Sequence, residues 1–194
     1  MLLSTAVLVF FYPLGDRMPT SIARTEEEIR AIYAEIDAQT DRGAPIIAAA
    51  IVDDLLTAAL KRRLILTTRL EERIFNYDTG GVASEYVARI DLAYLVGLFG
   101  DHIADDLRLI GKIRNRFAHR FEPIDFNDEK IANWCNTLHF KMAGRNPRDR
   151  YLIAFTRITT VLLVLKNITD MKIPNIAKQS ELAKELDGVS LTAD

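Results

Sequence analysis

The stretch PIIAAAIVDDLLTAALKRRLIL, residues 45–66, decides the fold class. Its apolar side chains recur on most sides of a helix and do not alternate as in a half-buried strand. A helix that is apolar nearly all round is typically buried among other helices. Asp53 and Asp54 lie in the middle of this stretch, and a carboxylate in apolar surroundings needs a partner. We therefore expect a buried central helix with paired acids.

The segments on either side of this helix also have helical patterns. They include TEEEIRAIYAEI, residues 25–36, and RDRYLIAFTRITTVLLVLKNI, residues 148–168. No run of alternating apolar and polar residues is bounded by turn residues, as strands would require. The sequence predicts an all-α fold, a single-domain bundle of roughly six to eight helices over residues 18–173. Residues 174–194, which begin with Pro174, are expected to form a polar tail or a short helix.

The first seventeen residues differ from the rest. MLLSTAVLVFFYPLG, residues 1–15, is apolar but shorter than the roughly 20 residues that span a bilayer. It lacks the basic start and the small-residue cleavage site of a signal peptide. Residues 1–17 are interpreted as an N-terminal extension. It is either a start-site artefact before Met18, a signal or anchor, or a packed segment.

Composition sets limits on the classes of function. The chain has 194 residues, 25 lysines and arginines against 27 aspartates and glutamates, one cysteine and three histidines. A near-neutral charge predicts no general attraction to nucleic acid. The lone Cys135 excludes an intramolecular disulfide and favours a reducing, cytoplasmic setting without a membrane partner. The sequence contains no nucleotide-binding motif or paired metal-ligand motif, so we expect no cofactor and no metal.

One further stretch, LRLIGKIRNRFAHRF, residues 107–121, carries the candidate site. At about 100° per residue, its apolar side chains gather on one face, which we expect to face the core. That face carries Leu109, Ile110, Ile113, Phe117 and Phe121. Arg114 lies at the edge of this face, whereas Asn115 and His119, four residues apart, share a polar face.

This Arg-Asn-x-x-x-His motif has a structural and a functional interpretation. In the structural one, Arg114 turns inward and forms an ion pair with Asp53, Asp54 or Asp91, so that its loss would destabilise the fold. In the functional one, the motif is catalytic: His119 is an acid or base for RNA cleavage, Arg114 holds the phosphate and Asn115 orients one of them. No metal would be required.

The segment from residue 108 to 157 is basic, with eleven lysines and arginines but five aspartates and glutamates. Arg108, Lys112, Arg116 and Arg120 are its candidates for binding a partner or nucleic acid. RNA or DNA phosphates could be met by these side chains. The acidic N-terminal half of the chain is the alternative, within one chain or across a dimer.

Three blocks in order resemble the mannitol-operon repressor family. They are DRGAPIIAAAIVDDLL at 41–56, VASEYVARIDLAYLVGLFGDHIADDLRLIGKIRNRFAH at 82–119 and IDFNDEKIANWCNTL at 124–138. The resemblance implies an all-helical bacterial protein of the cytoplasm that regulates transcription without a recognisable DNA-binding domain. It also implies self-association or binding to another regulator. Residues 1–17 have no counterpart in the family, and residues 80–94 follow its pattern only loosely.

A shorter resemblance is to HEPN-type domains, which carry an arginine, a polar residue and then a histidine. It maps onto Arg114, Asn115 and His119. This resemblance implies a homodimer, and in catalytic members two copies of the motif meet at the dimer interface. The sequence therefore leaves two functions open: a regulator that acts through a protein partner, and a metal-independent ribonuclease or toxin.

Overall fold

The protein is an all-α bundle. The computed structural model describes residues 20–64 and 66–167, which form seven α-helices and no strand. In chain order these are α2 (Thr20–Asp37), α3 (Gly43–Arg63), α4 (Thr68–Phe75), α5 (Tyr86–Leu95), α6 (Asp101–His119), α7 (Glu129–Thr137) and α8 (Pro147–Asn167). The predicted fold class is confirmed for this part of the chain. The proposed extension, 1–17, and the proposed tail, 174–194, lie outside the described residues.

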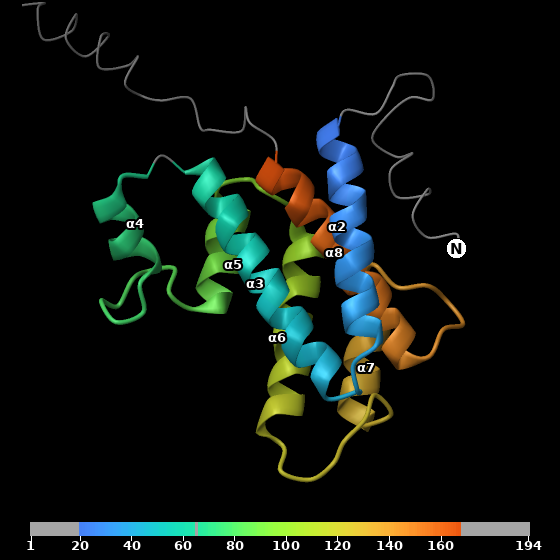
Figure 1. Ribbon diagram of the computed structural model, residues 1–194. Coiled ribbons are helices and arrows are strands. Elements are labelled where there is room, and N and C mark those ends of the chain that lie inside the picture. Colours follow the sequence, from blue (N-terminus) through green and yellow to red (C-terminus); the bar gives the residue numbers. More distant parts are fainter. Residues whose placement is uncertain (1–19, 65, 168–194) are drawn as a thin grey trace, which may run out of the picture.

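Helix α3 lies at the centre of the bundle, in front of α6 and beside α2 (Figure 1). It packs on α8, α6, α5 and α2, while α7 packs on α6 and α8. The core is built from long aliphatic and aromatic side chains on the facing sides of these helices. The largest fully buried ones are Ile36, Leu56, Leu60, Ile90, Leu107, Ile110, Ile113, Phe117, Ile131, Leu138, Tyr151 and Phe155.

The central helix has one buried and one exposed side. Its small and aliphatic residues, such as Ala48, Val52 and Leu56, are buried, whereas Ile46 and Asp54 are exposed. Helix α3 is also long and apolar enough to cross a membrane. Half of its most apolar 18-residue segment is buried inside the protein. The core helix of a soluble protein passes the same test, and here the buried side packs on four other helices.

The two ends of the bundle differ. At one end α4 stands away from the other helices (Figure 1) and none of its residues is buried. An ion pair of 2.6 Å between Lys61 and Glu71 connects it to α3. At the opposite end, the C-terminus of α6 and the loop that follows it lie beside the turn between α2 and α3. This second end carries the Arg-Asn-x-x-x-His motif.

Candidate interaction site at the end of helix α6

Helix α6 presents the motif because the helix is strongly two-sided. Leu107, Ile110, Ile113 and Phe117 are buried, as their spacing predicts. Phe121 is different: the sequence places it on the same face, but the side chain is fully exposed. The reason is that α6 ends at His119 and Arg120 adopts an extended backbone, so the chain leaves the helix before Phe121. The prediction that Phe121 faces the core is wrong.

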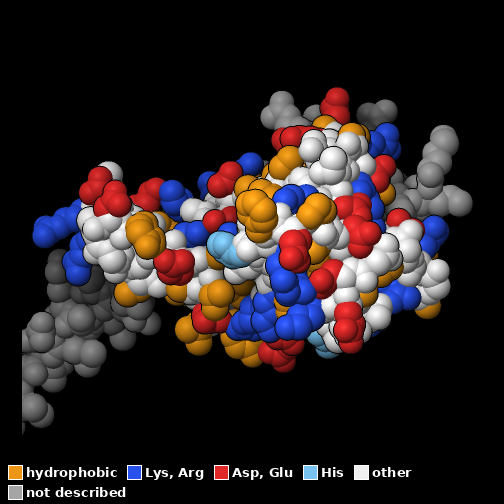
Figure 2. All heavy atoms as spheres, turned by 90° about the horizontal axis from the view of Figure 1, so that it is seen from below, with side chains coloured by type: hydrophobic (Ala, Val, Ile, Leu, Met, Phe, Trp, Pro, Cys, Tyr) orange, Lys and Arg blue, Asp and Glu red, His pale blue; other side chains and the backbone are white. Residues whose placement is uncertain are grey.

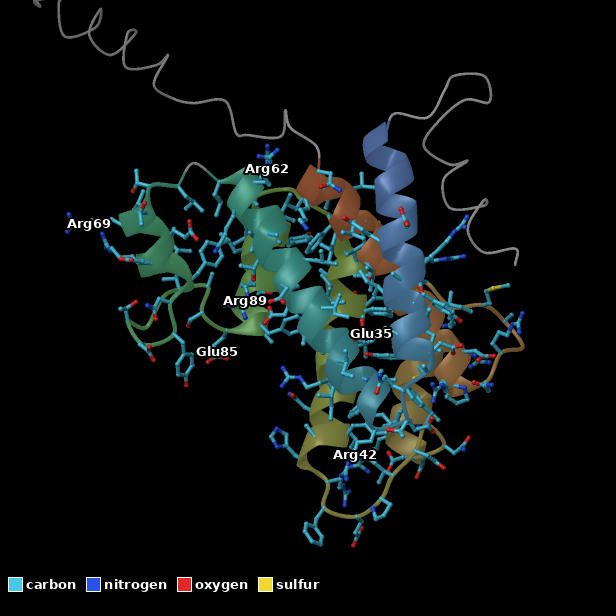
Figure 3. The ribbon with its side chains drawn as sticks, viewed as in Figure 1. Glu35, Arg42, Arg62, Arg69, Glu85 and Arg89 are labelled. Atoms are coloured by element: carbon cyan, nitrogen blue, oxygen red, sulfur yellow. The ribbon has the colours of Figure 1, made fainter. Side chains whose placement is uncertain are left out.

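Arg42, from the turn before α3, holds this helix end in place. Its guanidinium donates to the carbonyl oxygen of Phe117 at 3.1 Å and also to that of Arg120 (Figure 3). The last carbonyls of a helix lack partners within the helix, and a cation at this end also favours the helix dipole. Arg42 therefore fixes where α6 stops and where the following loop begins. No local sequence signal identified Arg42, because its partners lie more than seventy residues away.

The loop after α6 is fixed by a second arginine. Arg116 donates to both carboxylate oxygens of Asp128, at 2.7 and 3.2 Å. Asp128 also accepts hydrogen bonds from the backbone of Lys130 and Ile131 and so caps α7. The hydrogen bond from Arg116 lowers the pKa of Asp128 and raises the pKa of Arg116. Arg116 therefore positions the loop, and its charge is already matched by a carboxylate.

Arg114 does not form the ion pair that the sequence suggested. Asp53 pairs with Arg89 at 2.8 Å, and Asp91 pairs with Arg108 at 2.6 Å. Asp54 is exposed, and neither Asp54 nor Arg114 forms an ion pair with a described residue. The predicted pairing of Arg114 with one of these three acids is therefore wrong.

What surrounds Arg114 instead is the edge of the contact between α5 and α6. Arg114 is half-buried, and its charge is close enough to the Tyr86 hydroxyl to influence the pKa of that group. Burial and the charge of Asp53 raise the pKa of Tyr86, whereas the charges of Arg114 and Arg89 oppose that rise. The Tyr86 hydroxyl donates to the carbonyl oxygen of Leu107 at 3.0 Å. The guanidinium of Arg114 thus remains available to a further partner.

Asn115 and His119 are both exposed on the outer side of α6, four residues apart as the sequence requires. The spacing of Arg114 and His119 is five residues, which places them about 140° apart around the helix axis. The two side chains therefore leave α6 on different sides. The structure brings Asn115 next to His119 along the helix, but it does not bring Arg114 and His119 of one chain to a common point.

The four basic candidates divide into two pairs. Arg108 is bound by Asp91 and by Asp105, and Arg116 by Asp128. Lys112 and Arg120 are exposed and form no ion pair within the described part of the chain. Figure 2, which views this end of the molecule from below, shows lysine and arginine side chains gathered beside exposed hydrophobic ones. Lys112, Arg114 and Arg120 are thus the candidate cations with no acidic partner among the described residues.

A hollow of about 480 Å³ lies at the opposite end of the bundle, between the C-terminal ends of α3 and α8. Its lining consists of Ala58, Lys61, Arg62, Lys166 and Asn167. The described residues hold no group of three or more histidine, cysteine, aspartate or glutamate side chains arranged to bind a metal ion. Unpaired cations, an exposed amide, an imidazole and a fully exposed phenyl ring define the end of α6.

Comparisons with protein-family models, with characterised proteins and with solved structures found no match for this chain.

Proposed function

We propose that the protein is a regulator of the mannitol-repressor type that acts by binding a protein partner through the end of α6. The observation that carries this proposal is the full exposure of Phe121 directly after Arg120, at the end of a helix whose Lys112 and Arg114 also have no acidic partner among the described residues. Aromatic and arginine side chains contribute most of the binding energy of protein interfaces. A protruding surface of this kind favours recognition of a macromolecule over turnover of a small molecule.

The chemistry of the surface indicates the chemistry of the partner. A phenyl ring that no described residue covers needs an apolar pocket, and the surrounding cations need carboxylates. The expected partner is therefore a protein with an apolar pocket rimmed by aspartate or glutamate side chains. The resemblance to the mannitol-operon repressor family supports a second regulator of transcription as this partner. It also supports a cytoplasmic homodimer as the working form.

This proposal can be tested by photo-crosslinking in cells. A photoreactive amino acid replaces Phe121 in one strain, and Arg69, which is exposed on the distant α4, in a control strain. We expect a specific adduct from position 121 that position 69 does not give. Lys112→Glu together with Arg120→Glu should abolish that adduct, because the charge of the rim is reversed. Identical adducts from both positions, or an adduct that survives charge reversal, would refute the proposed surface.

The regulatory role has its own readout. Transcript levels are compared among strains that carry the wild-type chain, a gene deletion, or the variant Phe121→Ala. The variant should reproduce the transcript changes of the deletion, since it removes the proposed anchor without touching the core. A deletion strain with an unchanged transcript profile would exclude regulation of transcription. A Phe121→Ala profile equal to that of the wild type would exclude this surface as the regulatory one.

A metal-independent ribonuclease is the second candidate, and one observation favours it. Arg114, Asn115 and His119 have no ion-pair partner among the described residues, so they are available to RNA. In such a reaction His119 would take the proton of a ribose 2′-hydroxyl, and the 2′-oxygen would attack the phosphorus as the 5′-oxygen leaves and takes up a proton from water. Arg114 would stabilise the charge on the phosphate. The products would end in a 2′,3′-cyclic phosphate and a 5′-hydroxyl.

The angle between Arg114 and His119 means that this reaction needs two copies of the chain. Side chains about 140° apart on one helix do not reach the same phosphate, whereas Arg114 of one copy and His119 of another could. The test incubates the protein with structured and single-stranded RNA in the presence of a chelator. Cleavage by the wild type, lost in both Arg114→Ala and His119→Ala, is the expected result for a ribonuclease.

Mixing the two inactive variants tests the composite site. Mixed dimers would contain one intact pair of Arg114 and His119 and should recover a fraction of the wild-type cleavage. Arg69→Ala, on the exposed and distant α4, is the control outside the candidate surface and should retain cleavage. Absence of cleavage by the wild type, together with a specific adduct from position 121 in cells, would favour the regulator over the ribonuclease.

A further inference from the structure

Two of the three histidines in the chain meet on the surface, away from the motif. His102 lies in the first turn of α6, and His139 lies two residues after the last residue of α7. Their ring centroids are 4.3 Å apart and the ring planes are inclined by 48°. Both residues are exposed. No sequence pattern pairs them, because thirty-six residues lie between the two in the chain.

A buried carboxylate holds one of these two rings. Asp106, one turn after His102 on α6, is fully buried. One of its oxygens, Oδ1, accepts a hydrogen bond from the backbone N–H of His139 at 2.8 Å and lies 3.0 Å from Nδ1 of the same residue. Its second oxygen accepts from the backbone N–H of Phe140 at 3.1 Å. No lysine or arginine among the described residues forms an ion pair with this buried acid.

This arrangement fixes the tautomer of His139. Because the carboxylate accepts the proton on Nδ1, the lone pair of the neutral ring is placed on Nε2. A histidine that ligates a metal usually donates its other ring N–H to a carboxylate, which orients the ring and makes it a better electron donor. Asp106 and His139 have this relation, and His102 supplies a second imidazole beside the first.

We propose that His102 and His139 together bind one divalent transition-metal ion, with Asp106 as the residue that orients His139. Imidazole ligands select ions such as Zn²⁺, Ni²⁺ and Cu²⁺ over Mg²⁺ and Ca²⁺, which prefer oxygen. Two protein ligands leave coordination positions for water or for a group from a binding partner. The site would therefore bind an exchangeable metal ion at the surface. It is separate from the motif at the C-terminal end of α6.

The nearby cysteine does not take part in this site. Cys135 lies four residues before His139, a spacing that occurs in metal sites. Its side chain is fully buried, and burial raises the pKa of the thiol to about 12. The thiolate is the form of cysteine that binds metals, and this form is strongly disfavoured at neutral pH. The ligand set is therefore the two imidazoles.

A purely structural role explains only part of the cluster. The hydrogen bonds of Asp106 to the backbone of His139 and Phe140 attach the end of α7 to α6, and this attachment needs no imidazole. It gives no reason for a second histidine to stack on the first at the surface. A structural role also predicts that replacing the exposed His102 changes no binding property, which makes the two roles separable by experiment.

The test is a calorimetric titration of the full chain, without any affinity tag, with Zn²⁺ at pH 7.5. Wild-type protein should bind one ion per chain saturably. His102→Ala and His139→Ala should each weaken binding by at least about tenfold, and Asp106→Asn by about 10–100-fold, as for other carboxylates that orient metal-binding histidines. His119→Ala removes the third histidine, which lies outside the cluster, and is the matched control. It should leave binding unchanged.

Three results would overturn the proposal. The first is no saturable binding by the wild type. The second is unchanged binding by His102→Ala, a variant that alters an exposed side chain and should fold normally. The third is equal weakening by His119→Ala, which would show that zinc binds to isolated surface histidines. If Asp106→Asn fails to fold because the end of α7 is released, the comparison of His102→Ala with His119→Ala still decides the question.

Discussion

At the scale of single residues, the arginines of this protein fall into distinct roles that depend on their partners. Arg89 uses its planar group fully: it donates to both oxygens of Asp53 and to the backbone carbonyls of Ala83 and Ser84 (Figure 3). Arg114, also half-buried, has none of these contacts among the described residues. Arg89 therefore acts as the clasp between α3 and α5 that the sequence assigned to Arg114.

The clasp formed by Arg89 predicts a large effect on stability. Arg89→Ala leaves Asp53 and two carbonyl groups without their donor, and it should lower the free energy of unfolding by about 2–3 kcal/mol. Arg108→Ala is the matched control, because its pairs with Asp91 and Asp105 are more exposed. It should cost less than about 1 kcal/mol. Urea unfolding of both variants checks this, and equal stability of the two would contradict the role of Arg89.

The pair of Arg116 and Asp128 predicts a dependence on pH. The hydrogen bond from Arg116 holds the pKa of Asp128 below its ordinary value of 3.8. A carboxyl group with a lowered pKa in the folded state stabilises the protein above its ordinary pKa, and that contribution is lost as pH falls through the lower value. Asp128→Asn keeps a good cap for α7 but removes the charge.

The measurement is the free energy of unfolding of the wild type and of Asp128→Asn as a function of pH. At pH 6 the free energy of unfolding of the wild type should be larger than that of the variant. This difference should shrink below about pH 4. A difference that stays constant from pH 6 to pH 3 would show that the pair contributes nothing through its charge.

The sequence predicts the location of these polar residues better than it predicts their partners. The positions of Arg114, Asn115 and His119 on α6 follow from helical periodicity, and the structure reproduces them. The choice of Arg89 over Arg114 for Asp53 does not follow, because the crossing of α3 with α5 and α6 decides which guanidinium is near. Local pattern carries no information on such long-range geometry.

At the scale of elements, α5 and α6 approach each other closely because α6 has a glycine at the contact. A Cβ atom on Gly111 would lie 2.9 Å from Cε1 of Tyr86, closer than real Cβ contacts. The Tyr86 hydroxyl also donates to the Leu107 carbonyl on α6. Glycine inside a helix costs up to about 1 kcal/mol relative to alanine, so close packing must be the benefit of this residue.

This contact predicts a change of sign in a double-mutant cycle. Gly111→Ala alone should lower the free energy of unfolding by about 1–2 kcal/mol, because the half-buried ring of Tyr86, which is packed against the core, has to move. In a Tyr86→Ala background the same substitution should stabilise the protein by up to about 1 kcal/mol, since only the gain in helix propensity remains. A destabilising effect of equal size in both backgrounds would show that Tyr86 is not the obstacle.

The end of α6 shows why the exposure of Phe121 did not follow from the apolar pattern. That pattern continues through Phe121, but the helix ends two residues earlier, where Arg42 caps it from another part of the chain. Pro123, which cannot continue a helix, is consistent with an end near Arg120. Because the helix ends at this distant cap, the side chain of Phe121, which was predicted to face the core, is fully exposed at the candidate interaction site.

At the scale of the whole molecule, six of the described helices share a buried core, whereas α4 contributes no buried residue to it. The fold class could be predicted because a long apolar helix has to be covered by other elements, and the neighbouring segments have helical and not strand periodicity. Helix α4 is the exception within this bundle, since none of its residues is buried. Its described ties to the rest include the ion pair of Lys61 with Glu71 and the position of Lys61 over the ring of Phe75.

Low burial predicts low local stability for α4. Amide hydrogens of α4 should exchange with solvent orders of magnitude faster than those of α8, whose core-facing residues are buried. Lys61→Ala should accelerate exchange in α4 further while leaving α8 unchanged. Hydrogen exchange followed by mass spectrometry separates these segments. Equal protection of α4 and α8 would show that α4 unfolds together with the core.

In the proposed function, the Arg-Asn-x-x-x-His motif is a surface for recognition and does not hold the fold together. The free energy of unfolding of Arg114→Ala, measured by urea beside the wild type and Arg89→Ala, distinguishes these two roles. We expect a loss of at most about 1 kcal/mol for Arg114→Ala, from its aliphatic stem alone. A loss as large as that of Arg89→Ala would mean that Arg114 is a structural clasp, and it would contradict the account.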